Sequence, residues 1–341
     1  MRVLRTAAVS VRYRPRALAA SIACVLLAFA ATVITLGSGD YRIPPGEVLQ
    51  TLAGGGSMAD HFIVVQLRLP RVVTALLVGA ALALAGAAFQ SLVRNPLGSP
   101  DMLGFTAGAA TGALVVVVAG GSSLALACGA VVGGVATGVG VYALAWRRGV
   151  HGYRLILAGI GVSAILSGVN GYLMTKAQLM DAARAMLWLT GSLDGRGWGD
   201  VVPLAVAMAV LAPLIVAGCG RALQVMEMGD DVARALGVPA ERIRLTALAA
   251  AVLLTSFAAA AAGPVSFVAL TAPQVARRLT RAPGPNLVPS MLVGAVLLTG
   301  ADLVAQHAVP GRQLPVGVVT GVLGGGYLIW LLAAGRKAGR I

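Results

Sequence analysis

Charged side chains are scarce in this sequence. Of its 341 residues, 11% are Asp, Glu, Lys or Arg and 58% are hydrophobic, whereas soluble globular domains carry about 25% charged residues. A chain with so little charge cannot build the water-facing surface of a soluble domain. The scarcity excludes a soluble enzyme or binding module and favours a protein that is solvated mostly by lipid.

Aromatic residues are few as well, at 5%, although the net charge is +14. In a soluble protein that excess of positive charge would suggest nucleic acid as a partner. Here no basic stripe alternates with aromatic residues that could stack on bases, so nucleic acid is not an expected partner. The positive charges are better explained as loop residues that orient transmembrane segments.

Cysteine and lysine are almost absent. Cys24, Cys128 and Cys219 each lie inside an apolar run without metal-ligand spacing, so we expect small buried side chains, with no disulfide and no metal site. A nucleotide-binding P-loop needs Gly-Lys followed by Ser or Thr, but Lys176 and Lys337 are both followed by alanine. We therefore expect no catalytic residues and no bound cofactor on this chain, and ATP–Mg would be hydrolysed on a separate polypeptide.

Long apolar runs dominate what is present. One membrane crossing takes roughly 20 residues, so the sequence predicts an all-α membrane protein of about ten transmembrane helices. These would form a single transmembrane domain over residues 1–341, with no space left for a separate soluble domain. The ten runs lie at about 17–37, 71–93, 102–120, 124–146, 154–175, 200–219, 243–262, 264–279, 287–307 and 314–334.

Two of these runs have special features. The first follows five arginines, as in a signal peptide, but its length and the spans that follow favour a first transmembrane helix. The run at 264–279 is short and contains Pro264 and Pro273. Backbone groups freed by such breaks must meet protein or line a cavity, so this segment is expected inside the bundle.

The distribution of positive charge predicts the topology. With the N-terminus in the cytoplasm, ten spans place 19 of the 26 Lys and Arg residues in cytoplasmic segments and 7 outside. That asymmetry follows the positive-inside rule. We expect both termini in the cytoplasm and a multi-pass protein of the plasma membrane, surrounded by lipid.

Small and polar residues within the runs predict helix packing. Glycines about one helical turn apart in the fourth run allow close helix approach, and two segments, LVGAALALAG at 77–86 and LVGAVLLTG at 292–300, are weakly alike. Polar groups within spans usually face the interior of a helix bundle. The glycines are Gly129, Gly133, Gly134, Gly138 and Gly140, and the polar residues are Gln90, Asn170, Gln274 and Asp302.

The loop at about 221–244 is rich in charge and contains GDDVARALGV. Asp230 and Asp231 favour a helix N-terminus, and Gly237 followed by Pro239 ends the helix. Val232, Ala233 and Leu236 are expected to form one apolar face. A short helix of this kind is either an isolated interfacial helix or, as we favour, a coupling helix that docks on a cytoplasmic motor.

Two other segments carry candidate functional residues. Arg68 and Arg71 flank Pro70 at the expected outer mouth of the second span, and Arg312 precedes the last span on the same side. They are either interfacial anchors or contacts for acidic groups of an external protein. On the inner side, FQSLVRNPLGSPDMLGF at 89–105 predicts irregular backbone around a translocation path, with Asp101 as either the cap of the next helix or a path residue.

These segments resemble the permease subunits of the iron-siderophore and vitamin B12 class of ABC importers. The resemblance rests on RLPRVVTALLVGAALALAGAAFQSLVRNPLGSPDMLGFTAGA, MGDDVARALGV, AGPVSFVALTAP with ARRL, and QLPVGVVTGVLGG. They cover both halves of the chain in the family's order. RNPLGSPDMLGF, RLILAGIGVSA, MEMGDD and LGGGYLIWLL are more similar to a ferric-enterobactin permease subunit than to a vitamin B12 permease.

The resemblance implies a type II ABC importer permease fold, and it implies roles for particular positions. Arg68, Arg71 and Arg312 would meet a binding protein, while Asn95 and Leu97 would form one cytoplasmic gate. Gly152 and Tyr153 fall at a second gate but differ there in residue type. Independently of the resemblance, Asn170 is expected on the translocation path as a polar residue within a span. Gln274 stands where many family members carry histidine. The ATPase-coupling residues would be Gly229, Asp230, Asp231, Ala233, Arg234, Leu236 and Gly237.

The implied assembly contains a sister permease, two ATPase subunits and an external binding protein. The expected cargo is a ferric siderophore, more specifically an enterobactin-like catecholate, moved by alternating access. An ABC permease for vitamin B12 or haem is an alternative. A secondary transporter driven by an ion gradient is another, and it would require paired titratable groups near the midplane. No such pair is recognisable from spacing.

Overall fold

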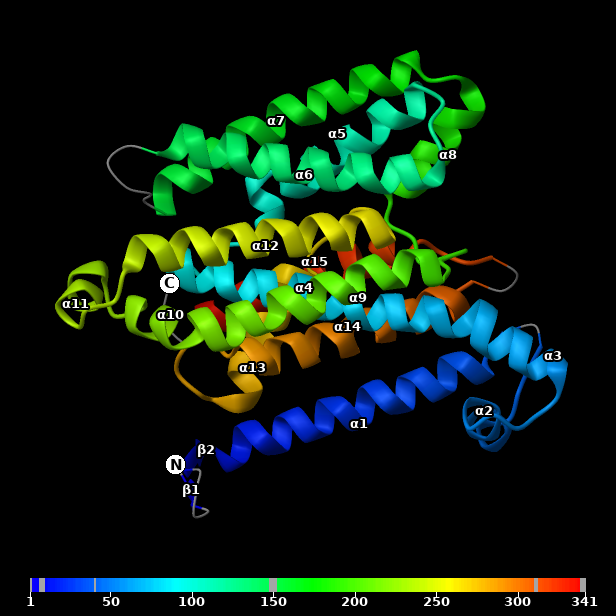
Figure 1. The fold of residues 1–341 in the computed structure, drawn as a ribbon, viewed down its shortest axis with the longest axis horizontal. Coiled ribbons are helices and arrows are strands. Elements are labelled where there is room, and N and C mark those ends of the chain that lie inside the picture. Colours follow the sequence, from blue (N-terminus) through cyan, green and yellow to red (C-terminus); the bar gives the residue numbers. More distant parts are fainter. Residues whose placement is uncertain (1, 6–9, 40, 147–151, 310–311, 338–341) are drawn as a thin grey trace.

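The computed structural model describes residues 2–5, 10–39, 41–146, 152–309 and 312–337. These form an almost entirely helical molecule (Figure 1), with one small antiparallel hairpin in which Arg2 pairs with Tyr13. Its strands and helices are β1 Arg2–Arg5, β2 Ser10–Tyr13, α1 Pro15–Gly37, α2 Pro45–Leu52, α3 Met58–His61, η1 Phe62–Arg68, α4 Leu69–Val93, η2 Pro100–Leu103, α5 Phe105–Val118, α6 Ser123–Ala145, α7 Gly152–Lys176, α8 Leu179–Leu189, α9 Trp198–Pro213, η3 Leu214–Cys219, α10 Gly220–Met226, α11 Asp230–Ala235, α12 Ala240–Ala262, α13 Val268–Thr280, α14 Leu287–His307 and α15 Val316–Lys337.

Each of the ten apolar runs contains a helix at the expected place. Within the described residues, seven helices or helix series are long and apolar enough to cross a membrane, and α5 and α15 are shorter apolar helices. The protein is thus an all-α membrane protein, while ten crossings remain a prediction. Of the charges that predict the topology, Arg147, Arg148 and Arg340 lie outside the described residues.

Helix α4 forms the centre of the bundle, with most of its length buried against α14, α12 and α13. Small residues permit this close packing. A Cβ atom at Gly79 would lie 2.3 Å from the carbonyl oxygen of Gly294, and one at Gly86 would lie 1.9 Å from that of Ala269. The two segments that resemble each other in sequence therefore lie against each other.

The glycines of the fourth run also act mainly in packing. Gly133 faces Gly108 of α5, while Gly138 faces Val252 of α12; Gly140 meets nothing within 4 Å. Cys24 and Cys219 are buried, as expected. Cys128 is exposed on α6, so its expected burial is wrong; it lines an open hollow between α6, α9 and α12.

The short helix α13 lies inside the bundle, as its two prolines predict. A non-helical stretch from Gly263 (φ 72°) to Phe267 (φ 70°) precedes it, and Val265 there is buried. Because the buried Gly86 of α4 lies against Ala269, α13 begins deep within the bundle. Its irregular lead-in meets protein rather than lipid.

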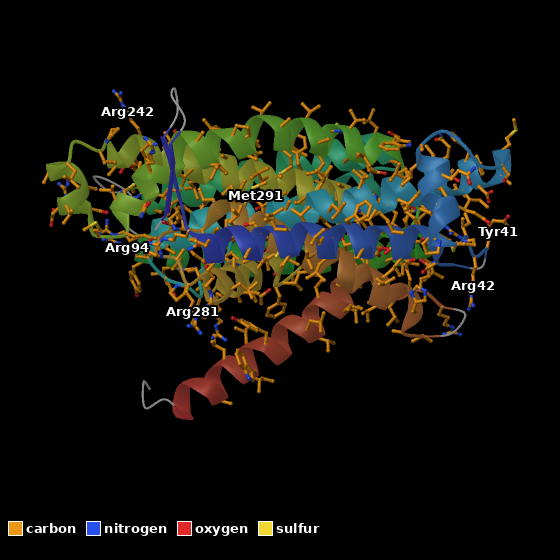
Figure 2. The ribbon with its side chains drawn as sticks, turned by 90° about the horizontal axis from the view of Figure 1, so that it is seen from below. Tyr41, Arg42, Arg94, Arg242, Arg281 and Met291 are labelled. Carbon is orange, nitrogen blue, oxygen red and sulfur yellow. The ribbon has the colours of Figure 1, made fainter. Side chains whose placement is uncertain are left out.

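The molecule has two chemically distinct ends. The start of α1, the end of α15 and α11 lie at one end, and α2, α3 and α8 lie at the other (Figure 1). Figure 2 shows Arg94 and Arg242 at the first end and Tyr41 and Arg42 at the second, with α15 inclined away from the bundle. We name these the inner and outer ends, following the predicted topology.

Candidate functional site

The short helix predicted in the loop at 221–244 is present as α11. Asp230 and Asp231 lie in its first turn after Gly229 (φ 118°), which takes a conformation that suits glycine. At the other end, Gly237 donates to the Arg234 carbonyl (2.9 Å) and Val238 to the Ala233 carbonyl (2.9 Å). These two bonds form a Schellman motif. Both predicted helix boundaries are confirmed.

The apolar residues of α11 do not share one face, so that expectation is wrong. Ala233 is fully buried and belongs to the main core. Val232 and Leu236 are exposed, as is Met228 just before the helix. Val232 lies about 100° around the helix from Ala233, and Leu236 is the C-cap residue, where the helix ends. Ala233 therefore anchors α11, while Val232, Leu236 and Met228 stay exposed.

Charged side chains connect α11 to its neighbours. Asp230 Oδ2 accepts from Arg244 Nη2 of α12 at 3.1 Å, and Asp230 Oδ1 lies 3.7 Å from Arg94 Nη2. Arg244 also donates to Glu241 (3.1 Å). We name Arg94, Asp230, Glu241 and Arg244 the inner cluster. Arg234 and Asp231 form a separate, exposed pair at 3.0 Å.

The candidate gate residues Asn95 and Leu97 follow the end of α4 directly. The chain turns at Arg94, which is left-handed (φ 53°). Asn95 Oδ1 then accepts from the Leu97 amide at 2.9 Å, and Leu97 is exposed. The Gln274 amide of α13 donates to the Pro96 carbonyl at 2.9 Å. Gln274 thus holds residues 95–97 through a neutral hydrogen bond, which does not require an imidazole.

The second gate candidate lies beside the first. A Cβ atom at Gly152 would lie 3.2 Å from Cα of Val93, so the start of α7 contacts the last residue of α4. Tyr153 is exposed. Asn170 further along α7 accepts from the Thr111 hydroxyl of α5 at 2.7 Å. That bond ties α7 to α5, and it favours a packing role for Asn170 over one on the translocation path.

At the outer end, Arg71 does not project freely toward a partner. Its guanidinium donates to Asp302 of α14 through Nη2 at 2.9 Å and Nε at 3.1 Å, and to Gln313 at 2.6 Å. Asp194 lies 3.5 Å away. The side chain of Arg71 is 13% exposed and that of Asp302 is 2% exposed. We name Arg71, Asp194, Asp302 and Gln313 the outer cluster.

The other two outer arginines differ from Arg71 and from each other. Arg68 donates to the Leu36 carbonyl at 2.7 Å and to the Tyr41 carbonyl at 2.6 Å, so it fastens the segment after α1 to the start of α4. Arg312 is exposed, beside Gln313 of the outer cluster. Among these three, Arg312 is exposed enough to reach another protein. Arg68 and Arg71 instead bond to groups within the chain and hold the outer loops in place.

Asp101 is not the cap of α5, which begins after Gly104. It lies in η2 and accepts from the Thr106 hydroxyl at 2.7 Å. Burial raises the pKa of the Asp101 carboxyl from 3.8 to about 6, and the Thr106 hydrogen bond opposes this rise. Within the described part of the chain, no three His, Cys, Asp or Glu side chains gather as a metal site would require.

Sequence reasoning named Asp230 of the inner cluster, but it missed Glu241 and Arg244 there, and Asp194 and Asp302 of the outer cluster, as functional residues. Asp302 stood out as a polar residue within a span, but its pairing with Arg71 joins residues 231 positions apart. Arg244 and Glu227 were visible only as loop charges. The one available signal was a lone carboxylate in an apolar helix, which usually has a cationic partner.

Comparison with known proteins places these features in a family. The model of the FecCD transport family matches residues 17–334. The ferric enterobactin transport system permease protein FepG of Escherichia coli is 47% identical over 318 residues, covering 91% of this chain and 95% of the relative. The vitamin B12 import system permease protein BtuC of Klebsiella pneumoniae is 33% identical, with coverage of 92% and 93%.

A solved structure supports the same conclusion. A protein assigned to the metal-chelate type of ABC transporter, in an inward-facing conformation, matches with a TM-score of 0.81 at 26% identity, covering 93% of this chain and 99% of that one. The importer permease fold predicted from the sequence is therefore confirmed. The chain belongs to the FecCD transport family.

Proposed function

We propose that this permease moves a ferric siderophore, most closely an enterobactin-like catecholate complex, across the plasma membrane into the cytoplasm by alternating access. The observation that carries this proposal is the 47% identity with a ferric enterobactin permease over nearly the whole of both chains. In the assembly we propose, two ATPase subunits bind and hydrolyse ATP–Mg, and an external binding protein delivers the cargo.

The inner end supports docking of an ATPase through α11. Leu236 is 64% exposed and Met228 is 69% exposed at the tip of the charged loop. Because contiguous exposed apolar patches mark interaction sites, we assign Met228, Val232 and Leu236 together to a contact with the ATPase. The Schellman motif and the buried Ala233 hold the helix in place, so a push on its exposed side would move it as a unit.

The outer end supports docking of a binding protein near Arg312. This exposed arginine adjoins Gln313, which contacts the buried Arg71. Acidic groups on a docking protein would be steered toward such a positive site. Arg71 and Arg68 would act behind this surface, by fixing the loops that carry it.

A sister permease would cover α7. Gly161, Gly168 and Gly171 on this helix meet no atom within 4 Å, and little of the helix is buried in the single chain. Small residues let helices approach closely within membranes. We expect the translocation path to lie between the two permeases, with the gate segments of each at its inner end.

The cargo is tested by uptake in cells that lack this chain and any redundant permease. Labelled iron would be supplied as a catecholate, a hydroxamate or a citrate complex, with labelled vitamin B12 in parallel. We expect a selective loss of catecholate uptake that the intact gene restores. Unchanged catecholate uptake in these cells would contradict the proposal, and a selective loss of vitamin B12 uptake would favour the other branch of the family.

Docking is tested with Leu236→Glu in a purified complex. A buried carboxylate at the contact should reduce copurification of the ATPase, because an unpaired charge is costly to desolvate. The matched control is Leu52→Glu, which changes an exposed leucine at the outer end, away from α11. Equal copurification of the ATPase with both variants would show that α11 is not the docking element.

A further inference from the structure

The loop at about 221–244, which carries α11, contacts the end of α4 at two points. The Ser91 hydroxyl donates to Glu227 Oε1 at 2.9 Å. Three residues further on, Arg94 Nη2 lies 3.7 Å from Asp230 Oδ1. Glu227 lies two residues before Gly229, the N-cap of α11, and Asp230 lies directly after it. The end of α4 is thus linked to residues on both sides of Gly229.

Asp230 has two partners of different character. Arg244 is 12% exposed and holds one carboxylate oxygen at 3.1 Å while also bonding Glu241. Arg94 is 46% exposed and approaches the other oxygen only to 3.7 Å. The first contact is shielded and fixes Asp230 to α12. The second is open to water and is weak, since exposed ion pairs contribute about 0–1 kcal/mol.

Arg94 lies between α11 and the gate segment, residues Asn95–Leu97. It is the first residue after α4, and its left-handed backbone sets the direction in which the gate segment leaves the helix. The gate segment is also held by α13, because the Gln274 side chain donates to the Pro96 carbonyl. A displacement of Arg94 therefore reorients Asn95 directly, with no intervening residue.

We infer that Arg94 is a positioning residue that transmits movement of α11 to the gate segment through Asp230. Arg244 keeps Asp230 on α12, so a shift of α11 turns the carboxylate about that contact and changes its pull on Arg94. A weak contact suits this task, because it can break and re-form in each transport cycle. The inference rests on the proposed roles of α11 in docking and of Asn95 and Leu97 in gating.

The test uses the complete importer in proteoliposomes, with ATP hydrolysis and ferric catecholate uptake measured in the same sample. Arg94→Gln removes the charge and keeps a polar side chain, whereas Arg94→Lys keeps the charge. Arg242→Gln is the matched control, an exposed arginine at the same end (Figure 2). We expect Arg94→Gln to lower the cargo moved per ATP about two- to fivefold, the range that a pair of up to ~1 kcal/mol allows. Arg94→Lys should restore most of the ratio, and Arg242→Gln should leave it unchanged.

A second comparison separates transmission from a general structural effect. Asp230→Asn and the double variant Arg94→Gln/Asp230→Asn should have the same ratio of cargo to ATP, because residues acting through one contact are non-additive. Additive losses would overturn the inference, as would an unchanged ratio in Arg94→Gln. Either result would leave the proposed function intact if the wild-type complex still couples uptake to ATP. A wild-type complex without ATP-driven uptake would instead contradict the proposed function.

Discussion

The two ends of the molecule use ion pairs in opposite ways. The outer cluster places one cation, Arg71, between two carboxylates, and its main pair with Asp302 is almost completely buried. The inner cluster places one carboxylate, Asp230, between two cations and is partly open to water. A buried pair is strongly destabilising to break, whereas an exposed one contributes little. From this difference we expect the outer end to keep its shape and the inner end to rearrange more easily.

The contrast between the two ends is tested most directly by removing Arg71. Arg71→Ala leaves Asp302 buried without its cation, and loss of one partner of a buried pair costs about 3–5 kcal/mol. We expect a large fall in the thermal unfolding midpoint of the purified subunit, or loss of the protein from the membrane.

Arg312→Ala is the control, because this nearby exposed arginine should change stability by less than about 0.5 kcal/mol. The double variant Arg71→Met/Asp302→Leu should recover much of the loss, since apolar residues of similar volume can replace a buried pair. Equal unfolding midpoints for Arg71→Ala and Arg312→Ala would refute the assignment of a rigid outer cluster.

The packing of α4, the helix that runs between the two clusters, can be tested at its glycines. Gly86→Ala introduces a Cβ 1.9 Å from the Ala269 carbonyl oxygen, and overpacking of this kind costs about 1–3 kcal/mol. Gly140→Ala, where a Cβ meets nothing within 4 Å, should not destabilise the protein. Thermal unfolding of the two variants checks this contrast, which would disappear if α13 did not lie against α4.

The two clusters can be compared with Asp101, a carboxyl that forms no ion pair within the described part of the chain. Its folded-state pKa is raised to about 6, so the folded protein binds this proton more tightly than the unfolded chain does. Stability then falls as pH rises from about 4 to 6. Asp101→Asn should stabilise the protein at pH 7 by up to about 3 kcal/mol, because the pKa rises by about two units and each unit corresponds to about 1.4 kcal/mol. It should give little stabilisation at pH 4. The thermal unfolding midpoints of both proteins at pH 4 and pH 7 check this. An equal increase of the midpoint at both pH values would argue against a raised pKa of the Asp101 carboxyl.

The smallest effect is expected on the exposed surface of α11. Arg234 and Asp231 form a 3.0 Å pair with side chains 70% and 98% exposed, so Arg234→Ala should change stability by less than about 0.5 kcal/mol. Arg244→Ala, which removes the shielded partner of Asp230, should cost more. The order of the two unfolding midpoints tests whether the inner cluster differs from an ordinary surface pair.

Much of the fold follows from local pattern. The apolar runs predict where helices lie, Gly237 with Pro239 predicts where α11 ends, and Pro264 with Pro273 predicts that α13 is buried. The amphipathic helix α8 was not predicted, because its eleven residues are too few for a span. Patterns of this kind depend on neighbours within one or two helical turns, which a single sequence displays.

The candidate sites were less accessible to prediction. Arg71 and Asp302 are 231 positions apart, and no local spacing shows that they meet. Ala233 was placed on an exposed face because apolar character alone does not distinguish a residue that anchors a helix from one that docks a partner. The resemblance to a family supplied the positions of both candidate gates, and the structure adds that Gly152 lies against the end of α4.

The most direct test of the account is uptake by the reconstituted importer under controlled energy supply. Proteoliposomes would contain the permease pair and the ATPase, with loaded binding protein outside and either ATP–Mg or an ion gradient as the only source of energy. The account predicts that ferric catecholate enters only when ATP–Mg is present on the ATPase side. Uptake driven by the ion gradient alone, without ATP, would contradict it.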